Sequence, residues 1–570
     1  MPEQRAGQGN MSVTRREVVG GLIIAATTSC LYPASATAED RDVSALRSIN
    51  IMNFIRAEEP REKMDLFAPV RNQMEQIKKH GFPATWLLQY DALVEGPFVE
   101  FLKAEMPPNH EVGIWFEMNR RICDDAKIAW RGNPDWEWDY HVPVAYAIGY
   151  TPDERRKLAD TAMATFRRVF GHSARSIASW NLDAVSVEHF TTHYEVDAFG
   201  NCRDQLATDG FTIWGAPITG YYPNTVNAWS PAVSHKNQLQ TPIFRLLGQD
   251  PVYYYDNRLP YPDTMEPVWA SGQSKTFVKN FLEMIAIHPT GQFGYAQLGQ
   301  ENSFGWPAMQ SAYPMQMEQL AHISKMGGVV IETMSETGRK FKRAFKTTPP
   351  QAQVMLEDPF GNTSSPERTI WYQSRFLRAN LHFRDREFYL RDLQVYNDRY
   401  PQPYLTQPAT IHGIEQRMLA VLDGYHWSDD NVHAGKPGTR AMGSFALVDR
   451  EGRATALEMG LPPVVNESAN SLLATVRLAT GGALNVRFSE SELAFWLSGT
   501  AEHERLQLIF QWVPSRSAIE RVEPHELRYK YRDFEYHVHL VNGEAAATKS
   551  GVVITTGSKG PLVFRMAQLM

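Results

Sequence analysis

Three scarcities narrow the classes of protein to which this chain of 570 residues can belong. It has only three cysteines and no CxxC motif, which excludes a disulfide framework and argues against a structural zinc cluster. Its net charge is -7, so it lacks the basic excess that non-specific binding of nucleic acid requires. Whether Cys123 and Cys202 pair with each other is left open by the sequence.

Several motifs that would announce a chemistry are also missing. Neither GxGxxG nor GxxxxGK[ST] follows the first predicted strand, which argues against a nucleotide-binding open sheet. The nucleophile motif G-x-S-x-G does not occur, so a serine nucleophile is not indicated. The sequence therefore predicts no cofactor.

The N-terminal segment "TRREVVGGLIIAATTSCLYPASATA" has the layout of an export signal. Twin arginines at positions 15 and 16 precede an apolar run and then small residues, as in signals of the Tat type. The run is too short to span a bilayer stably, and no other segment comes closer to that length. We predict a signal peptide over residues 1–38 and a periplasmic or secreted mature protein. Lipid anchoring at Cys30 is the alternative, although Thr27 stands where such signals carry leucine.

Apolar strand-like runs alternate with helical patterns up to about residue 345. Thr151 and Glu154 form a capping-box pattern at the start of the helix predicted over residues 151–171. Strands that alternate with helices predict a parallel sheet, and seven or eight units in roughly 300 residues favour a closed barrel. The predicted strands are residues 48–57, 84–93, 110–119, 174–184, 197–205, 241–248, 292–302 and 329–334.

The pattern changes near "KTTPPQ" at residues 346–351. Beyond it, strand-like runs such as "EFYLRDLQVY" and "ATVRLATGGALNVRFS" are separated by turn residues, which is typical of a β-sandwich. We therefore predict an α/β fold with a parallel (β/α)7-8 barrel followed by a C-terminal β-sandwich. The barrel, over residues 48–345, is the predicted catalytic domain, and residues 350–570 form the accessory domain.

Polar side chains follow the predicted barrel strands, at the ends where a parallel barrel collects its reactive groups. Glu301 in "GQENSFGW" and Asp204 in "CRDQLATDGFTIWG" are the leading pair of catalytic carboxylates, with Asp183 as the alternative partner. Each acid also has a structural interpretation, which is to hold an arginine or to cap a helix. The predicted substrate-binding residues are Arg56, Gln89, Asp91, Glu117, Arg120, Arg203, Asp209, Trp214, Tyr222, Arg245 and Asn302.

Arginine recurs at or near four of these strand ends. Because a guanidinium binds carboxylate or sulfate in a bidentate manner, four that converge would suit an anionic sugar. In the alternative interpretation, each arginine pairs with a neighbouring acid and holds the rim of the barrel. The rings of Trp214 and Tyr222 are expected to stack on sugar faces. The four arginines are Arg56, Arg120, Arg203 and Arg245.

The segment "HFTTH" places His189 and His193 four residues apart, which is the spacing of a metal pair on a helix. It lacks the glutamate of HExxH, and its helix is expected on the exterior of the barrel. We therefore predict no metal at this pair.

The segments "FPATWLLQYDAL" and "NHEVGIWFEMN" resemble the second and third strands of the polysaccharide deacetylase barrel, a type that also occurs in family-57 and family-38 glycoside hydrolases. The resemblance covers residues 48 to 345 in layout and about 30 residues in motif. The segments "CRDQLATDGFTIWG", "TPIFRLLGQDPVYYYD" and "GYAQLGQENSFGW" are similar to those of a large group of exported bacterial proteins.

The departures from these families concern the metal. The resemblance to deacetylases implies an Asp-Asp pair after strand one and HxxxH after strand three, but "RAEEPRE" and "EMNRRICDD" stand there. The H-x-D of family 38 is missing as well. What remains is the metal-free mode of family 57, with acids on strands four and seven, which Asp183 and Glu301 match by location. A sialidase family with a related barrel is a further candidate that the arginines would suit.

We therefore predict an exported glycoside hydrolase that cleaves an oligo- or polysaccharide, acidic sugars included, with two carboxylates and no metal. The alternatives are a polysaccharide deacetylase with an atypical metal site and a non-catalytic carbohydrate-binding protein. A carbohydrate is the predicted partner, whereas nucleic acid is not. The sugar, the linkage and the oligomeric state are left open by the sequence.

Overall fold

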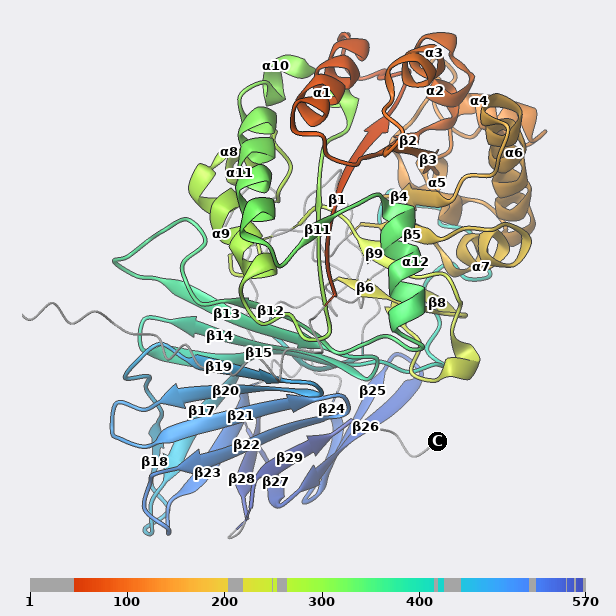
Figure 1. Ribbon diagram of the computed structural model, residues 1–570. Coiled ribbons are helices and arrows are strands. Elements are labelled where there is room, and N and C mark those ends of the chain that lie inside the picture. The colour runs from red at the N-terminus through yellow and green to blue at the C-terminus, as the bar shows by residue number, and fades with distance from the viewer. Residues whose placement is uncertain are drawn as a thin grey trace, which may run out of the picture. The chain divides into compact units, whose positions relative to one another are not determined.

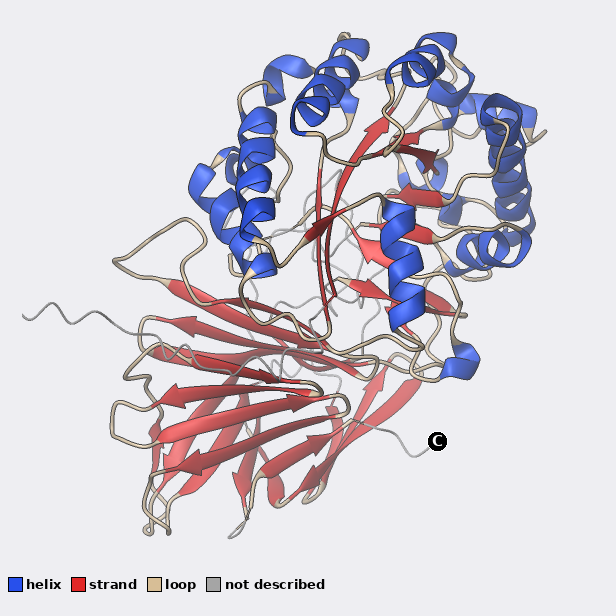
Figure 2. Ribbon diagram, in the orientation of Figure 1, coloured by secondary structure: helices blue, strands red, loops and turns tan. Residues whose placement is uncertain are grey.

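The computed structural model describes residues 46–202, 219–248, 250–253, 264–414, 419–424, 442–511, 519–549, 551–557 and 560–566. The predicted signal peptide lies outside these residues, and so do Arg203, Asp204, Asp209 and Trp214. Residues Ser44–Met570 form one compact unit. Within it, a parallel sheet covered by helices is followed along the chain by antiparallel sheets (Figures 1 and 2).

Seven parallel strands form the first sheet, in the spatial order β10-β1-β2-β3-β4-β5-β9. Two short strands complete it, since β11 (Val330–Ile331) runs parallel to β1 and β6 (Gly220–Tyr221) runs antiparallel to β9. The seven are β1 (Leu46–Ile55), β2 (Thr85–Leu88), β3 (Glu111–Trp115), β4 (Ser176–Ser179), β5 (Ala198–Asn201), β9 (Ile243–Arg245) and β10 (Phe293–Leu298).

The sheet curls, but the closed barrel that the sequence predicts is not observed. Its strand order begins at β10 and ends at β6, and no pairing joins these two strands within the described ranges. The antiparallel strand β6 occupies the edge of β9 that would otherwise face β10. The predicted parallel sheet is therefore confirmed as a curled half-barrel. The predicted strand over residues 84–93 is shorter than expected, because the helix α2 begins at Tyr90.

Helices connect the parallel strands, as the alternating pattern predicts (Figure 2). The capping box of α6 is present, with the Thr151 amide 2.8 Å from Glu154 Oε2 and the Glu154 amide 3.3 Å from Thr151 Oγ1. The α-helices are α1 (Phe67–His80), α2 (Tyr90–Val94), α3 (Gly96–Glu105), α4 (Arg120–Asp125), α5 (Val142–Ala145), α6 (Pro152–Phe170), α7 (Ala184–His193), α8 (Ala270–Gln273), α9 (Lys275–Ala286), α10 (Trp306–Met309), α11 (Ala312–Met326) and α12 (Met334–Ala344). Short 3-10 turns are η1 (Ala147–Gly149), η2 (His235–Asn237) and η4 (Asn302–Phe304).

From Gln351 onward the chain forms antiparallel sheets, at the point where the sequence pattern changes. One contains β12 (Gln351–Met355), β13 (Glu367–Gln373), β14 (Leu377–Arg384), β15 (Glu387–Val395), β16 (Ala420–Asp423), β17 (Gly443–Val448), β18 (Ala454–Ala456), β23 (Arg505–Gln511), β27 (Gly543–Thr548) and β28 (Gly551–Thr556). The other contains β19 (Val464–Ser468), β20 (Ser471–Arg477), β21 (Ala483–Ser489), β22 (Glu492–Ser498), β24 (Ile519–Glu523), β25 (Glu526–Tyr531), β26 (Phe534–Val541) and β29 (Leu562–Arg565). The strands β7 (Pro223–Asn224) and β8 (Asn227–Pro231) form a separate two-stranded sheet.

The two large antiparallel sheets share one apolar core. Phe445 on β17 lies 5.7 Å from Phe495 on β22, and Phe510 on β23 lies 5.9 Å from Phe564 on β29, between ring centroids. A second apolar core fills the space between the parallel sheet and its helices. None of the helices in the described ranges is long and apolar enough to cross a membrane.

The two cysteines of the described residues are buried. The Sγ atom of Cys123 lies 3.5 Å from the Tyr150 hydroxyl oxygen. Burial raises the pKa of the Cys123 thiol to about 11, so it is protonated at neutral pH. Cys123 and Cys202 are not joined by a disulfide in this structure.

Candidate active site at the strand ends of the parallel sheet

Arg56, one residue beyond β1, connects three strand ends. Its buried guanidinium lies 3.1 Å from Glu117 beyond β3, between Nη2 and Oε2, and 3.2 Å from Glu301 beyond β10, between Nη1 and Oε2. The Cζ atom of Arg56 lies 4.2 Å from the ring centroid of Trp138. One buried cation thus compensates two buried carboxylates, and removal of the cation would leave both acids without that compensation.

Amide side chains fix this network in place. The Asn302 side chain accepts from the Arg56 amide at 2.9 Å and donates to the Arg56 carbonyl at 2.8 Å, so it binds the backbone of Arg56 on both sides. Gln89 donates to Glu117 Oε2 at 3.3 Å. Five of the predicted site residues therefore lie together, because the carboxyl ends of parallel strands meet at one edge of the sheet.

Asp91 supports this network from the first turn of α2. Its Oδ2 atom accepts from the amides of Ala57 and Glu58 at 3.1 and 3.0 Å, and its Oδ1 atom accepts from the Ala92 amide at 2.6 Å. Burial raises the pKa of Asp91 to about 7, although these hydrogen bonds favour the charged form. The carboxylate fastens the segment that follows β1, and so it positions Arg56.

A cavity of about 430 Å³ opens beside this network, and we call it the strand-end cleft. Its wall combines aromatic rings with charged groups from the ends of β1, β4 and β10 and from the loop before α8. A narrower cavity adjoins it and shares Trp180 and Glu266 with it. The lining residues are Glu59, Arg61, Glu62, Met64, Trp180, Glu266, Trp269, Glu301, Ser303 and Phe304.

Glu266 is a buried carboxyl group in the wall of the cleft. It is 4 % exposed, and its Oε1 atom accepts from Gln300 Nε2 at 3.2 Å. Its Oε2 atom accepts from Thr264 Oγ1 at 2.9 Å and from Trp269 Nε1 at 3.1 Å. Burial, and to a smaller extent the charge of Glu301, raises the pKa of Glu266 to about 7. The carboxyl can therefore both accept and give up a proton near neutral pH.

Trp180 lines the cleft next to these acids, and behind it Phe54 and Trp115 line the adjoining narrow cavity. Phe54 and Trp115 stack with ring centroids 3.9 Å apart, and Trp180 meets each of them edge-on at 5.4 Å. Flat rings beside carboxylates are the combination that sugar rings require, since their C–H faces pack on aromatic surfaces while their hydroxyls donate to carboxylates.

Sequence reasoning missed Glu266 as a site residue, and it also missed Trp269 in the wall of the cleft. Glu266 lies in "TMEPVWA", in a loop after β9 and not directly at a strand end. A usable signal was nonetheless present, because Glu266 is followed closely by proline and Trp269, much as Glu301 is followed by aromatic residues.

Asp183 lies outside the cleft, in a structural role. It is the N-cap of α7, and its Oδ1 atom accepts from the amides of Val185 and Ser186 at 3.0 and 3.2 Å. It also pairs with the buried Arg155 at 3.0 Å between Nη1 and Oδ1. The structural interpretation of Asp183 as a helix cap is confirmed, and the residue does not join Glu301 in the cleft.

Tyr222 does not present a ring to the cleft, contrary to expectation. It is 3 % exposed, its hydroxyl donates to the Phe345 carbonyl at 2.8 Å, and its ring lies 5.2 Å from that of Phe341. Both contacts are with α12 and the residue that follows it, so the ring packs in the core. An aromatic ring with no exposed face cannot stack on a sugar.

The predicted arginines do not converge as a group. Arg120 binds the carbonyl groups of Asn133, Pro134 and Trp136, and so it holds a surface loop. Arg245 is buried at the end of β9 and does not line the cleft. Arg56 is thus the one predicted arginine of the described ranges at the strand-end network. Arg203, Asp204, Asp209 and Trp214 lie outside those ranges.

The histidine pair on α7 is engaged in local contacts. His189 Nε2 lies 2.6 Å from Asp160 Oδ1, and His193 Nδ1 lies 3.0 Å from the His189 carbonyl. The partner of His189 lies on α6 and that of His193 on α7 itself, so both nitrogens are engaged in local contacts.

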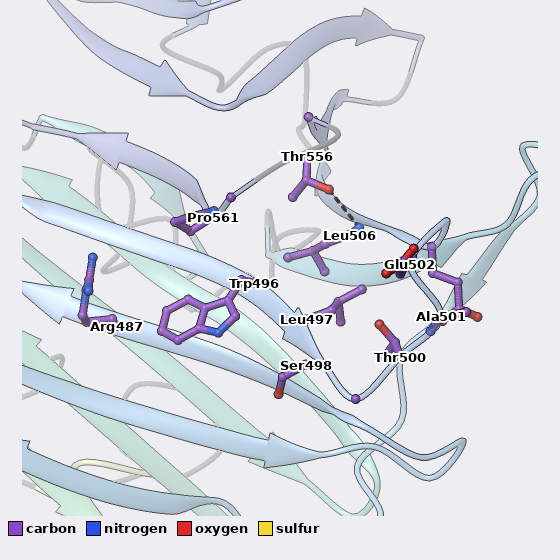
Figure 3. A pocket seen from close by; sticks show the side chains of 14 residues that line it. Arg487, Trp496, Leu497, Ser498, Thr500, Ala501, Glu502, Leu506, Thr556 and Pro561 are labelled. Carbon is purple, nitrogen blue, oxygen red and sulfur yellow. Dashed lines mark hydrogen bonds between the residues drawn. The ribbon is translucent and has the colours of Figure 1, made fainter.

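A second cavity of about 410 Å³ lies among β21, β22, β23 and β28 (Figure 3). Trp496 and Arg487 line it, with the guanidinium carbon 5.9 Å from the ring centroid. Its acids, Glu502 and Glu504, are not buried, so water screens their charges. The strand-end cleft is therefore the candidate active site.

The residues at these strand ends differ from the metal ligands that the resemblance to the deacetylase barrel implies. At the ends of β1 and β3 stand Arg56 and Glu117, and the guanidinium occupies the space between Glu117 and Glu301. In the part of the chain that the structure describes, no three histidine, cysteine, aspartate or glutamate side chains of the cleft converge to the spacing of a metal site. The described residues of the cleft therefore do not fit a divalent ion.

No family model matches the chain, and no curated protein does. Similar solved structures include a Parabacteroides distasonis protein named provisionally as a glycoside hydrolase/deacetylase, at 14 % identity and a TM-score of 0.48, covering 65 % of this chain and 91 % of that one. A provisional polysaccharide deacetylase from Mycobacterium smegmatis is similar at 12 % identity and a TM-score of 0.33, and the match covers 54 % of this chain and 93 % of that one. A family-4 acetyl xylan esterase from Clostridium thermocellum is similar at 11 % identity and a TM-score of 0.25, and the match covers 52 % of this chain and 94 % of that one.

These names correct the predicted activity. Deacetylase or acetyl esterase recurs in the names of the similar solved structures, and this contradicts the prediction of an O-glycosyl hydrolase. They agree with the polysaccharide deacetylase part of the resemblance and do not support the family-57 and family-38 part. The error has a physical source, since a pair of carboxylates serves acid-base chemistry on acyl and glycosyl groups alike.

Proposed function

We propose that this protein binds a polysaccharide in the strand-end cleft and hydrolyses an ester-linked acyl group on it, with Glu266 as the general base. The observation that supports the proposal is a buried carboxyl with a pKa of about 7 in an aromatic-walled cleft. A base with this pKa is about half ionised at neutral pH, where both its proton-accepting and its proton-donating forms are present. Export by the N-terminal signal would deliver such a protein to polysaccharides outside the cytoplasm.

The reaction that these residues support needs only water as the second substrate. The Glu266 carboxylate takes a proton from water while the water oxygen attacks the acyl carbon, and a tetrahedral intermediate forms. The bond between the acyl carbon and the sugar oxygen then breaks, and the proton on Glu266 moves to that oxygen. The products are a carboxylic acid and a free sugar hydroxyl, and the carboxylate of Glu266 is restored.

An ester is favoured over an amide as the bond that is cleaved. An alkoxide leaves more readily than an amide nitrogen, so an ester needs less stabilisation of the intermediate than an N-acetyl group does. Glu301, held next to Arg56, is positioned to accept hydrogen bonds from sugar hydroxyls and to keep the pKa of Glu266 raised. Trp180, Trp269 and Phe304 supply the apolar wall for the sugar rings.

Acetate release from acetylated xylan and acetylated glucomannan by the purified full-length chain, with and without EDTA, tests the proposal. We expect turnover that survives EDTA and falls at least about 100-fold in Glu266→Gln, because removal of a general base costs about this factor. The substitution keeps the size of the side chain, and Glu188→Gln on the exposed face of α7 is the matched control, with unchanged turnover.

The pH profile and glycan binding separate the alternatives. In the wild type, kcat/KM should rise with pH through about 7 as Glu266 ionises. Glycan binding without any acyl release on the whole panel would overturn the enzyme and support a carbohydrate-binding protein. Turnover that EDTA abolishes and Zn²⁺ restores would overturn the proposed carboxylate mechanism.

A further inference from the structure

The outer face of the hairpin β25 and β26 carries a cluster of potential metal ligands far along the chain from the strand-end cleft. Side chains alternate along both strands, and Leu527, Tyr529 and Tyr536 point into the core between the antiparallel sheets. Glu526 and His539 are directly opposite each other in the register of the two strands. His537 precedes His539 by two residues, so the two imidazoles lie on the same outer face.

The three side chains converge at close range. One ligand atom from each of Glu526, His537 and His539 lies within 4.8 Å of the other two, and no other such group occurs in the described ranges. The two imidazole centroids are 4.7 Å apart, and His539 Nδ1 lies 3.9 Å from Glu526 Oε1. Tetrahedral Zn²⁺ with bonds of about 2.0–2.2 Å holds its ligand atoms about 3.4 Å apart. Small side-chain rotations therefore close the set around an ion, with no movement of the backbone.

We propose that Glu526, His537 and His539 form a binding site for a divalent transition-metal ion such as Zn²⁺. Two imidazoles and one carboxylate are a ligand set that suits this ion, and a water molecule would complete a tetrahedron. The side chains of Glu526 and His539 are 17 % and 37 % exposed, so an ion can reach them from solvent.

The charged groups of the cluster include one that attracts a metal ion and one that competes with it. Glu526 brings a carboxylate to the two imidazoles, and a carboxylate attracts a cation. Arg528 competes for the carboxylate, since its Nε atom donates to Glu526 Oε2 at 3.0 Å. Glu526 Oε1 is the oxygen nearer to His539. Glu523 Oε2 lies 3.8 Å from Arg528 Nη2, so the guanidinium interacts with two carboxylates and not with Glu526 alone.

A bound ion would join the two strands of the hairpin. On the opposite face, the hydroxyls of Tyr529 and Tyr536 donate to the carbonyl groups of Val421 and Ala420 on β16, at 3.2 and 2.6 Å. The hairpin is thus fixed to its neighbours from inside, and the ion would add a cross-strand link from outside. Because the ion binds only the folded hairpin, it would raise the melting temperature as its concentration rises.

Titration of the EDTA-treated, desalted full-length chain with ZnCl₂ in a calorimeter tests the site, and Co²⁺ absorption reports the coordination geometry. We expect one binding event per chain, a Co²⁺ spectrum typical of tetrahedral coordination, and a higher melting temperature with Zn²⁺. The variant His537→Gln/His539→Gln should lose this event, and Glu526→Gln should weaken it at least tenfold. Arg528→Gln should strengthen it, because the competing guanidinium is gone.

Two controls identify the site of any ion that binds. His525→Gln alters the neighbouring histidine, whose Nδ1 lies 2.9 Å from the Gly543 carbonyl, and should bind Zn²⁺ as the wild type does. Equal melting temperatures of all variants in EDTA would show that they fold. No binding of Zn²⁺ to the wild type below millimolar concentration overturns the proposal, and so does unchanged binding in the double variant. Acyl hydrolysis in the strand-end cleft is expected to be the same with and without the ion.

Discussion

Charged side chains are buried in one region of this molecule and exposed to solvent in another. At the strand ends of the parallel sheet, the side chains of Arg56, Glu117 and Glu301 are at most 6 % exposed. On the outer face of the second antiparallel sheet, the ion pair Arg565–Glu492 has side chains that are 51 % and 29 % exposed. The same chemical groups are therefore strongly coupled in the first region and screened by water in the second. Burial, and not the number of charges, decides where proton affinities shift and chemistry is supported.

The largest effect that would test this contrast is expected from Arg56→Met. It leaves Glu117 and Glu301 buried without their shared cation, and we expect the free energy of unfolding to fall by about 3–5 kcal/mol. Urea denaturation followed by circular dichroism measures the change. A loss below about 1 kcal/mol in the free energy of unfolding would be typical of an exposed ion pair. It would show that burial does not make this network more strongly coupled than the exposed pair.

A change of intermediate size is expected in the pH dependence of stability. The folded-state pKa of Glu266 is raised to about 7, so its stabilising contribution is fully present below its ordinary pKa and is lost as pH rises through about 7. For Glu266 alone this loss is on the order of 3 kcal/mol between pH 4.5 and pH 8.

Glu266→Gln should therefore reduce the decline in stability between acidic and mildly alkaline pH, as measured by urea midpoints at pH 5 and pH 8. The decline should not vanish, because Asp91 and Asp392 also have raised pKa values, of about 7 and about 6, with burial as the main cause. Equal declines in the variant and the wild type would contradict the raised pKa of Glu266.

The smallest effect is expected from Arg565→Ala on the antiparallel sheet. Its Nε atom lies 2.8 Å from Glu492 Oε1, but water screens the pair, and we expect a loss below about 1 kcal/mol. Salt should weaken even this effect, because exposed charges are screened within a Debye length. A loss of more than about 2 kcal/mol in the same urea assay would show that exposure does not predict coupling in this protein.

Strand-end residues were predictable from the sequence because topology alone brings them together. Glu117 and Glu301 are separated by more than half of the parallel region along the chain, yet both follow apolar strands of one sheet. Parallel strands place their carboxyl ends at one edge, so the sequence predicts that these acids are neighbours. Thr151 and Glu154 were predictable for a different reason, since a capping box depends only on residues three apart.

Glu266 and Tyr222 show where this reasoning fails. Glu266 lies in a loop, and a loop has no periodicity from which its direction can be inferred. Tyr222 follows a strand of two residues and was expected at the cleft, but α12 covers it. In both cases the contact partners come from distant segments, so their burial depends on packing that no local pattern encodes.

By itself, the sequence determined the alternation of strands and helices, the change to antiparallel sheets after residue 350 and the acids at the strand ends, because these follow from periodicity and local hydrogen bonding. Only the tertiary structure decided that the described strands of the parallel sheet form a curled half-barrel, that Arg56 lies between two carboxylates, and that Glu266 has a pKa near neutrality. The physical reason is that desolvation and the field of neighbouring charges depend on distances between groups far apart in the chain.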